Sequence, residues 1–176
     1  SWEDESCLAT IGDKNYLDLI KSKLAPDDIA KTGMAIKPGL AVSNLYYLLK
    51  NTKIPLNQKI LFCTLGDYII SELTGHNPAI HLTNAAATGI VDLNTGDWNN
   101  DIIEKLGFNK IKLPPIINEN QVCGYLNHQQ KIPVYPAVGD QQAAILGIGL
   151  NSGNELSINI GTGAQLERRE EKRKEG

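Results

Sequence analysis

The sequence predicts an α/β fold, and three of its segments carry that prediction. Residues 134–138 form a short apolar run with two valines, which is typical of a buried strand. The chain then turns at Gly139, and residues 140–149 continue with small and aliphatic side chains, which predicts a tightly packed helix. Residues 155–160 alternate polar and apolar side chains, as expected of a second strand.

Composition bounds the class of protein. The chain has 176 residues, of which 41% are hydrophobic and 21% charged, as in an ordinary globular protein. A net charge of -3 favours neither nucleic acid nor an anionic membrane as a partner. No apolar run approaches the length of a membrane span, and no signal peptide is visible. The chain opens on Ser1-Trp2-Glu3-Asp4 without Met, which looks like the middle of a longer protein.

The cysteines and histidines show no metal-ligand spacing. There are three cysteines, far apart in the sequence, so we expect reduced and mostly buried thiols in a cytoplasmic protein. The three histidines form no cluster with them and are interpreted as surface or loop residues. These positions are Cys7, Cys63 and Cys123, and His76, His81 and His128.

Helical signals dominate the first half of the chain. Apolar residues over 16–24 recur at helical spacing, and Pro26-Asp27-Asp28 ends that element. Residues 31–39 are loop-like, and residues 42–49 predict an amphipathic helix. A further helix is expected over 65–73, with Thr64 as N-cap, Asp67 three residues on and Gly75 as the stop. Its apolar positions are assigned to the core: Leu65, Tyr68, Ile69 and Leu73.

The following residues predict short strands and turns. Residues 90–93 predict a strand, with 94–97 as a hairpin turn. Asn99 is expected to cap a helix over 101–106 that Gly107 stops. Residues 113–116 are expected to be extended because each of two prolines biases its predecessor away from helix, and 122–126 predicts another strand.

Asp140 is the first candidate site residue. It stands where a strand ends and a helix begins, and an acid there can simply cap the unpaired N–H groups of the first turn. Gln141 and Gln142 are harder to explain as caps, because their amides offer neutral donors and acceptors suited to a polyhydroxy ligand. Taken singly, Asp140 is better interpreted as a helix cap, and a catalytic role is favoured only together with its neighbours and the ordered motifs described below.

A second candidate site follows the last predicted strand. Residues 155–160 lead directly into Gly161-Thr162-Gly163, where glycines allow backbone N–H groups to approach an anion closely. Many tight turns share this pattern, so the signal is weak by itself. Residues 166–176 are almost entirely charged, which predicts a solvated helix or a disordered tail, and they are excluded from the fold prediction.

An ordered set of short motifs resembles the FGGY family of carbohydrate kinases. The clearest are Gly139-Asp140-Gln141-Gln142-Ala143-Ala144 and Asn159-Ile160-Gly161-Thr162-Gly163. Others, in the family's order, are Trp2-Glu3-Asp4, Leu65-Gly66-Asp67-Tyr68, Asn84-Ala85-Ala86 and the stretch from Thr88-Gly89 to Trp98. The resemblance extends to Gln165 and implies a partial sugar kinase domain of the ribonuclease-H-like, actin-like ATPase fold.

The resemblance implies a role for seven residues. Asp140 corresponds to the base that accepts a proton from the sugar hydroxyl, and it also helps to place Mg²⁺ beside ATP. Gln141, Trp2 and Asp4 correspond to sugar-binding residues. Gly161, Thr162 and Gly163 correspond to the family's second phosphate-binding loop. The implied partners are a small-molecule sugar and ATP, with no nucleic acid and no membrane; a homodimer is left open.

The resemblance also divides the chain. Residues 1–150 correspond to the C-terminal part of the sugar-binding domain, 151–165 to the start of the ATP-binding domain, and 166–176 to a charged tail. The family's first phosphate-binding turn, Asp-x-Gly-Thr, has no match in the chain. The fragment alone is therefore expected to be inactive, and a non-catalytic sugar-binding or regulatory module is the alternative.

The substrate implied by the resemblance is a ketose. The motifs are most similar to sedoheptulose kinases, with xylulose kinase as the alternative. Gly39 stands roughly where glycerol kinases carry a pocket tyrosine, which disfavours glycerol.

Overall fold

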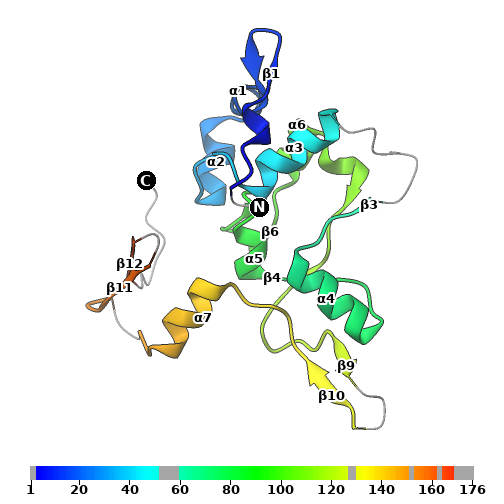
Figure 1. Ribbon diagram of the computed structural model, residues 1–176, viewed down its shortest axis with the longest axis vertical. Helices are drawn as coiled ribbons and strands as arrows, with labels where there is room; N and C mark the ends of the chain where they lie inside the picture. The colour runs from blue at the N-terminus through cyan, green and yellow to red at the C-terminus, as the bar shows by residue number, and fades with distance from the viewer. Residues whose placement is uncertain (1–2, 52–59, 127–129, 151–152, 162–163, 169–176) are drawn as a thin grey trace. The chain divides into compact units, whose positions relative to one another are not determined.

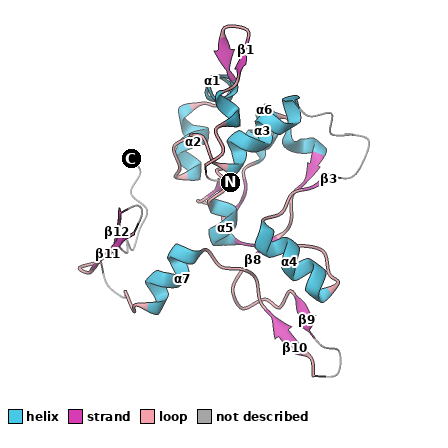
Figure 2. Cartoon of the chain, viewed as in Figure 1, coloured by secondary structure: helices cyan, strands magenta, loops and turns pink. Residues whose placement is uncertain are grey.

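A computed structural model describes residues 3–51, 60–126, 130–150, 153–161 and 164–168. The chain divides into two compact units, residues 1–137 and 138–176 (Figure 1). Helices and short strands are interspersed along it, which confirms the α/β class (Figure 2). The two units are described separately below.

Helices form the framework of the first unit, and the chain-local signals placed most of them correctly. They are α1 (Tyr16–Lys23), α2 (Pro26–Thr32), α3 (Ala41–Asn51), α4 (Leu65–Thr74), α5 (Leu82–Ala86) and α6 (Asn100–Leu106), with 3-10 turns η1 (Ser6–Leu8) and η2 (Phe108–Lys110). Two helices were missed. One is α2, which begins at Pro26 because proline fits the first position of a helix, where no N–H is needed; the other is α5, over residues for which no helix was expected.

The strands of the first unit are short and pair two by two. Antiparallel pairs join β1 (Thr10–Ile11) to β2 (Lys14–Asn15), β5 (Val91–Asp92) to β6 (Asp97–Trp98), and β9 (Gly124–Leu126) to β10 (Ile132–Val134). Parallel pairs join β3 (Ile60–Leu61) to β7 (Ile111–Lys112), and β4 (Ile80–His81) to β8 (Ile116–Ile117). The predicted hairpin over residues 90–97 is thereby confirmed, whereas β9 begins two residues later than expected.

The main core lies among α1, α3 and α6. Fully buried side chains from these helices surround Phe108 of η2: Ile20, Val42 and Ile102. The hydroxyl of Tyr16 donates to Oδ1 of Asn51 at 2.8 Å and ties the start of α1 to the end of α3. A smaller cluster holds Ile80, Ala85 and Val91. Burial of these apolar side chains is the main stabilising contribution in this unit.

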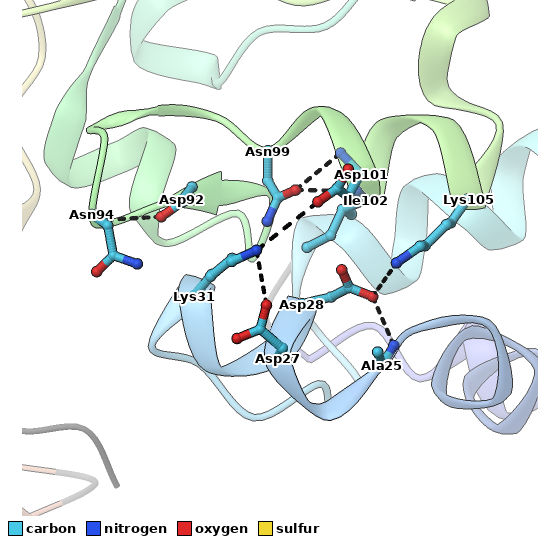
Figure 3. Close-up of polar contacts among 10 residues, drawn as sticks. All are labelled: Ala25, Asp27, Asp28, Lys31, Asp92, Asn94, Asn99, Asp101, Ile102 and Lys105. Atoms are coloured by element: carbon cyan, nitrogen blue, oxygen red, sulfur yellow. Dashed lines mark hydrogen bonds and ion pairs between the residues drawn. The ribbon is translucent and has the colours of Figure 1, made fainter.

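Two helices are joined by an ion pair whose carboxylate is buried. Nζ of Lys105 on α6 lies 2.6 Å from Oδ2 of Asp28 on α2, and the same oxygen accepts from the Ala25 N–H at 2.7 Å (Figure 3). The Asp28 side chain is 4% exposed. Burial raises the pKa of Asp28, but the bonds from Lys105 and Ala25 outweigh it and hold that pKa below its ordinary value.

The apolar face of α4 corrects a prediction. Its capping box forms as expected, since the Thr64 hydroxyl and the Asp67 carboxylate bond each other's backbone N–H groups, and Gly75 ends the helix at φ +71°. The four positions assigned to the core, however, are exposed. Leu65 is 75% exposed, and Tyr68, Ile69 and Leu73 are about half exposed. Helical spacing shows which side of a helix is apolar but not whether another element covers it.

The second unit contains α7 (Asp140–Gly147) and the antiparallel hairpin of β11 (Leu156–Ile160) and β12 (Ala164–Arg168). The strand predicted over 155–160 is confirmed. The charged tail prediction is wrong for residues 166–168, which pair with β11 as part of β12; residues 169–176 lie outside the described part. None of the described residues of this unit is buried. The prediction of a tightly packed helix is therefore wrong for α7.

Candidate functional site

Asp140 is the first residue of α7, and its carboxylate is exposed. The N-cap is Gly139, whose backbone carbonyl accepts from the Ala143 N–H at 2.9 Å. Oδ1 of Asp140 accepts from the N–H of Gln141 at 2.8 Å. The preceding strand β10 ends at Val134, and Tyr135 is 48% exposed, so the buried strand predicted over 134–138 is wrong. The expected turn into a helix is confirmed.

Gln141 occupies the next position of the same turn, and its side chain is exposed. The Asp140 carboxylate and the Gln141 amide therefore belong to consecutive residues of the first turn of a helix. The backbone N–H groups of that turn have no carbonyl acceptor within the helix and can add further donors. Asp140 and Gln141 are the two predicted site residues that the structure holds on one element. The carboxylate can accept hydrogen bonds from the hydroxyls of a polyol, and the amide can both donate to them and accept from them.

Asp4 lies in the first unit, between the chain start and η1. Its Oδ1 accepts from the Ser6 N–H at 2.9 Å, and its backbone carbonyl accepts from the Gly39 N–H at 3.0 Å. Hydrogen bonds from Ser6 lower the pKa of Asp4, so it is a carboxylate at neutral pH. Gly39 adopts φ +82°, a conformation that glycine reaches without strain. Trp2 lies outside the described residues.

Gly161 follows β11 at an exposed bend. The register pairs Ile160 with Ala164, so residues 161–163 connect the two strands of an antiparallel hairpin. Thr162 and Gly163 lie outside the described residues. The strand leading into this loop is thus confirmed, and phosphate binding by the loop stays a prediction.

Residue His81 was misjudged from the sequence. It is 6% exposed, not a surface residue, and its Nδ1 accepts from the Thr83 N–H at the start of α5. The Thr83 hydroxyl lies 2.8 Å from the same nitrogen, and Nε2 lies 3.5 Å from Oε2 of Glu119. Histidine is not among the usual N-cap residues, so the sequence carried no capping signal at this position. His81 has a structural role here.

Two further contacts concern Ala137, three residues before Asp140. Nδ2 of Asn84 on α5 donates to the Ala137 carbonyl at 2.7 Å. On another side, a Cβ placed on Gly66 of α4 would lie 2.9 Å from Cβ of Ala137. The sequence placed Asn84 and Gly66 in the family motifs but gave no sign that both reach the same residue.

Acidic side chains gather elsewhere without forming a metal site. A hollow of about 380 Å³ is lined by Asp92, Asp97, Asp101 and neighbouring residues of the β5–β6 hairpin and α6. Beside this hollow, Nζ of Lys31 lies 2.8 Å from Oδ2 of Asp27 and 4.0 Å from Oδ2 of Asp101 (Figure 3). Among the described residues, no group of three or more His, Cys, Asp or Glu side chains could hold a metal ion. None of the predicted site residues lines this hollow.

The thiols are not poised as nucleophiles. Cys7, Cys63 and Cys123 are free, and burial raises the pKa of each. Their S–H forms therefore predominate at neutral pH. Within the described part of the chain, no helix is long and apolar enough to cross a membrane.

The chain matches known carbohydrate kinases over most of its length. Residues 2–147 match the FGGY family of carbohydrate kinases, N-terminal domain. A glycerol kinase of Alkalilimnicola ehrlichii is 31% identical over 146 residues, which cover 77% of this chain and 29% of that protein. The chain thus spans about a third or less of the length of such relatives.

Solved structures agree on the fold. The xylulose kinase of Rhodospirillum rubrum superposes with a TM-score of 0.75 at 19% identity, over 90% of this chain and 34% of that one. The glycerol kinase of Plasmodium falciparum, solved with ADP, gives a TM-score of 0.72 at 25% identity, over 85% of this chain and 32% of that one. The chain therefore has part of the ribonuclease-H-like, actin-like ATPase fold, and it belongs to the FGGY family of carbohydrate kinases.

Proposed function

We propose that residues 1–176 belong to an ATP-dependent kinase that phosphorylates a hydroxyl of a ketose, with Asp140 as the general base. The observation that carries the proposal is the position of Asp140 within the family match. It is the exposed first residue of α7, in the Gly-Asp-Gln-Gln motif of the matched region. A carboxylate there is presented on a helix terminus rather than on a loose loop, which suits a group that must be held in line.

The chemistry requires a base because a sugar hydroxyl is a poor nucleophile until its proton is accepted. Asp140 would take that proton as the hydroxyl oxygen attacks the γ-phosphorus of ATP and the bond to the β,γ-bridging oxygen breaks, leaving ADP and the sugar phosphate. Gln141 would bind a neighbouring sugar hydroxyl. In the first unit, Asp4 would accept hydrogen bonds from sugar hydroxyls, and Trp2 would supply an apolar face.

ATP and Mg²⁺ are the cofactors that the family implies. Mg²⁺ is commonly held by one or two carboxylates together with substrate phosphates, and a single exposed carboxylate at Asp140 fits that donor set. When bound, Mg²⁺ would neutralise charge on the phosphates. Gly161, Thr162 and Gly163 would contact phosphate through backbone N–H groups, and the exposed bend at Gly161 leaves room for it.

The domain assignment is part of the proposal. Residues 1–150 would be sugar-binding, and residues 151–165 would begin the ATP-binding domain. The boundary between the two compact units follows residue 137, just before Asp140, whereas the proposed division between domains follows residue 150.

The choice of sugar is the finer part. A sedoheptulose-like ketose is proposed from the motifs, with xylulose as the alternative from the same resemblance. The glycerol kinase relatives make glycerol a third substrate to test. Gly39 argues against glycerol only through the resemblance, because it stands roughly where glycerol kinases carry a pocket tyrosine.

The decisive experiment substitutes Asp140→Asn in the complete kinase polypeptide. Loss of the base is expected to lower kcat by roughly 10²–10⁴-fold, while ketose binding by calorimetry stays within a few-fold. Asp13→Asn, at the exposed turn between β1 and β2, removes an equal charge and serves as the control. Unchanged turnover in Asp140→Asn would remove Asp140 from the mechanism. Sedoheptulose, xylulose and glycerol, compared by kcat/KM, would rank the substrates.

A second function is a non-catalytic sugar-binding module, favoured by the absence of any Asp-x-Gly-Thr turn in residues 1–176. Purified residues 1–176 are expected to release no ADP with ketose and Mg-ATP. Calorimetry separates the two functions for this chain: ketose binding without nucleotide binding supports the module. Sugar-dependent ADP release by the isolated chain would show that its 176 residues suffice for catalysis.

A further inference from the structure

We infer that Asn84 and Gly66 are positioning residues for Asp140. They hold Ala137 between α5 and α4 and so fix the backbone position from which the chain continues to Asp140. The inference rests on the proposed role of Asp140 as the base. It assigns to these two residues an effect on the rate of phosphoryl transfer that acts through the backbone of residues 137–140.

Ala137 is the last residue of the first unit. Only Val138 and Gly139 separate it from Asp140, so the point at which Ala137 is fixed limits where the carboxylate can lie. The preceding residue, Pro136, is buried, and its ring restricts φ, so the backbone enters Ala137 from a fixed direction. Ala137 is therefore a point close to the base at which contacts can hold the backbone.

The Asn84 contact is directional and spans 53 residues of sequence. The donor–acceptor distance of 2.7 Å, from the side-chain amide to the Ala137 carbonyl, is short for an N–H···O bond. The support beneath it is rigid: Ala85 of the same helix is fully buried, and His81 caps the start of α5. Asn84 thus presents its amide from a fixed element rather than from a loop.

The Gly66 contact is a steric limit from α4. A Cβ at Gly66 would lie 2.9 Å from Cβ of Ala137, which is well inside ordinary van der Waals separation. Neither atom can rotate away, since both are attached directly to backbone. The turn that carries Gly66 is locked by the capping box, in which Asp67 is fully buried and its Oδ2 accepts from the Thr64 hydroxyl at 2.7 Å. Any side chain at residue 66 must therefore move Ala137 and the start of α4 apart.

A pair of complementary substitutions tests this. In the complete kinase, Gly66→Ala is expected to lower kcat at least tenfold with KM for the sugar changed less than threefold, because misplacement of a reacting group by about 1 Å can cost two orders of magnitude in rate. Ala137→Gly removes the opposing Cβ, so the double variant Gly66→Ala/Ala137→Gly is expected to recover kcat to within threefold of wild type. Asn84→Asp keeps the shape but removes the donor and should lower kcat similarly.

The matched control is Gly75→Ala at the other end of α4. Gly75 has open space around its Cβ position and φ +71°, so this substitution strains α4 without reaching Ala137. It should lower the unfolding midpoint while leaving kcat unchanged. If Gly75→Ala slows the enzyme as much as Gly66→Ala, or if the double variant fails to recover kcat, the effect is general destabilisation and the inference is wrong.

A second readout uses residues 1–176 alone and needs no turnover. Amide hydrogen exchange at Ala143, whose N–H bonds the Gly139 carbonyl, reports on the first turn of α7. Exchange should accelerate in Gly66→Ala and Asn84→Asp, return in Gly66→Ala/Ala137→Gly, and stay unchanged in Gly75→Ala. Equal exchange in all variants would overturn the inference. A wild-type kinase with no sugar phosphorylation would overturn the proposed function instead, and the exchange data would still decide the anchoring.

Discussion

The ion pair between Asp28 and Lys105 offers the sharpest test of how the first unit is held together. The perturbation is Lys105→Met, which keeps most of the aliphatic stem and removes the ammonium. Removing one partner of a fully buried pair typically costs about 3–5 kcal/mol, because the remaining charge is left uncompensated. Lys105 is 39% exposed and Asp28 keeps its bond from the Ala25 N–H, so a smaller loss of about 2 kcal/mol is expected.

The assay is urea unfolding of residues 1–176 at pH 7, followed by far-ultraviolet circular dichroism. A loss of about 2 kcal/mol corresponds to a midpoint lower by roughly 1 M urea for a domain of this size. Adding Asp28→Asn to Lys105→Met removes the uncompensated charge and should recover at least half of the loss, because the amide oxygen can still accept from Ala25. Lys110→Met, at an exposed lysine, is the control and should change stability by less than about 0.5 kcal/mol.

Two outcomes would refute this reasoning. A Lys105→Met variant as stable as wild type would show that solvent replaces the ammonium at no cost. A double variant as unstable as the single one would show that the loss comes from packing of the lysine stem and not from the buried carboxylate.

Three further predictions follow from the same structure. The pKa of Asp28 is lowered in the folded state, so its contribution to stability is complete above its ordinary pKa near 3.8 and is lost as the pH falls through the lower folded value. The free energies of unfolding of wild type and Asp28→Asn, measured against pH, should therefore converge at low pH. A constant difference between the two curves would contradict this. Thr64→Ala should destabilise α4 by about 1–2 kcal/mol in urea, with Thr64→Ser close to wild type, because the hydroxyl caps the helix and bonds the buried Asp67; equal losses in both variants would implicate the methyl group instead. Residues 1–176 should bind a hydrophobic dye and self-associate through the exposed face of α4, and Leu65→Glu with Leu73→Glu should reduce both in light scattering, whereas Glu72→Gln should not.

Local chemistry was predictable from the sequence. The capping box at Thr64 and Asp67, the cap at Asn99 and the stops at Gly75 and Gly107 all formed where expected. Each depends on residues within a few positions of one another, so the interactions that decide it are visible in a short window of sequence. The helix beginning at Pro26 was missed because proline both ends one helix and starts the next.

Exposure was not predictable in the same way. The apolar sides of α4 and α7 were expected to be covered, and the described residues of the structure leave both open. Burial depends on what lies against a surface, which periodicity does not encode. His81 shows the converse, since a polar residue in a loop-like stretch proved to be buried because it caps α5 and lies beside Glu119.

The sequence by itself determined the family, the caps and stops of α4 and α6, and the candidate base at Asp140, because ordered motifs and capping residues are properties of the chain. Only the tertiary structure decided that residues 66 and 84 meet at Ala137, three residues before that base. The physical reason is that a hydrogen bond across 53 residues and a missing Cβ act through space, and neither leaves a pattern in the order of the residues.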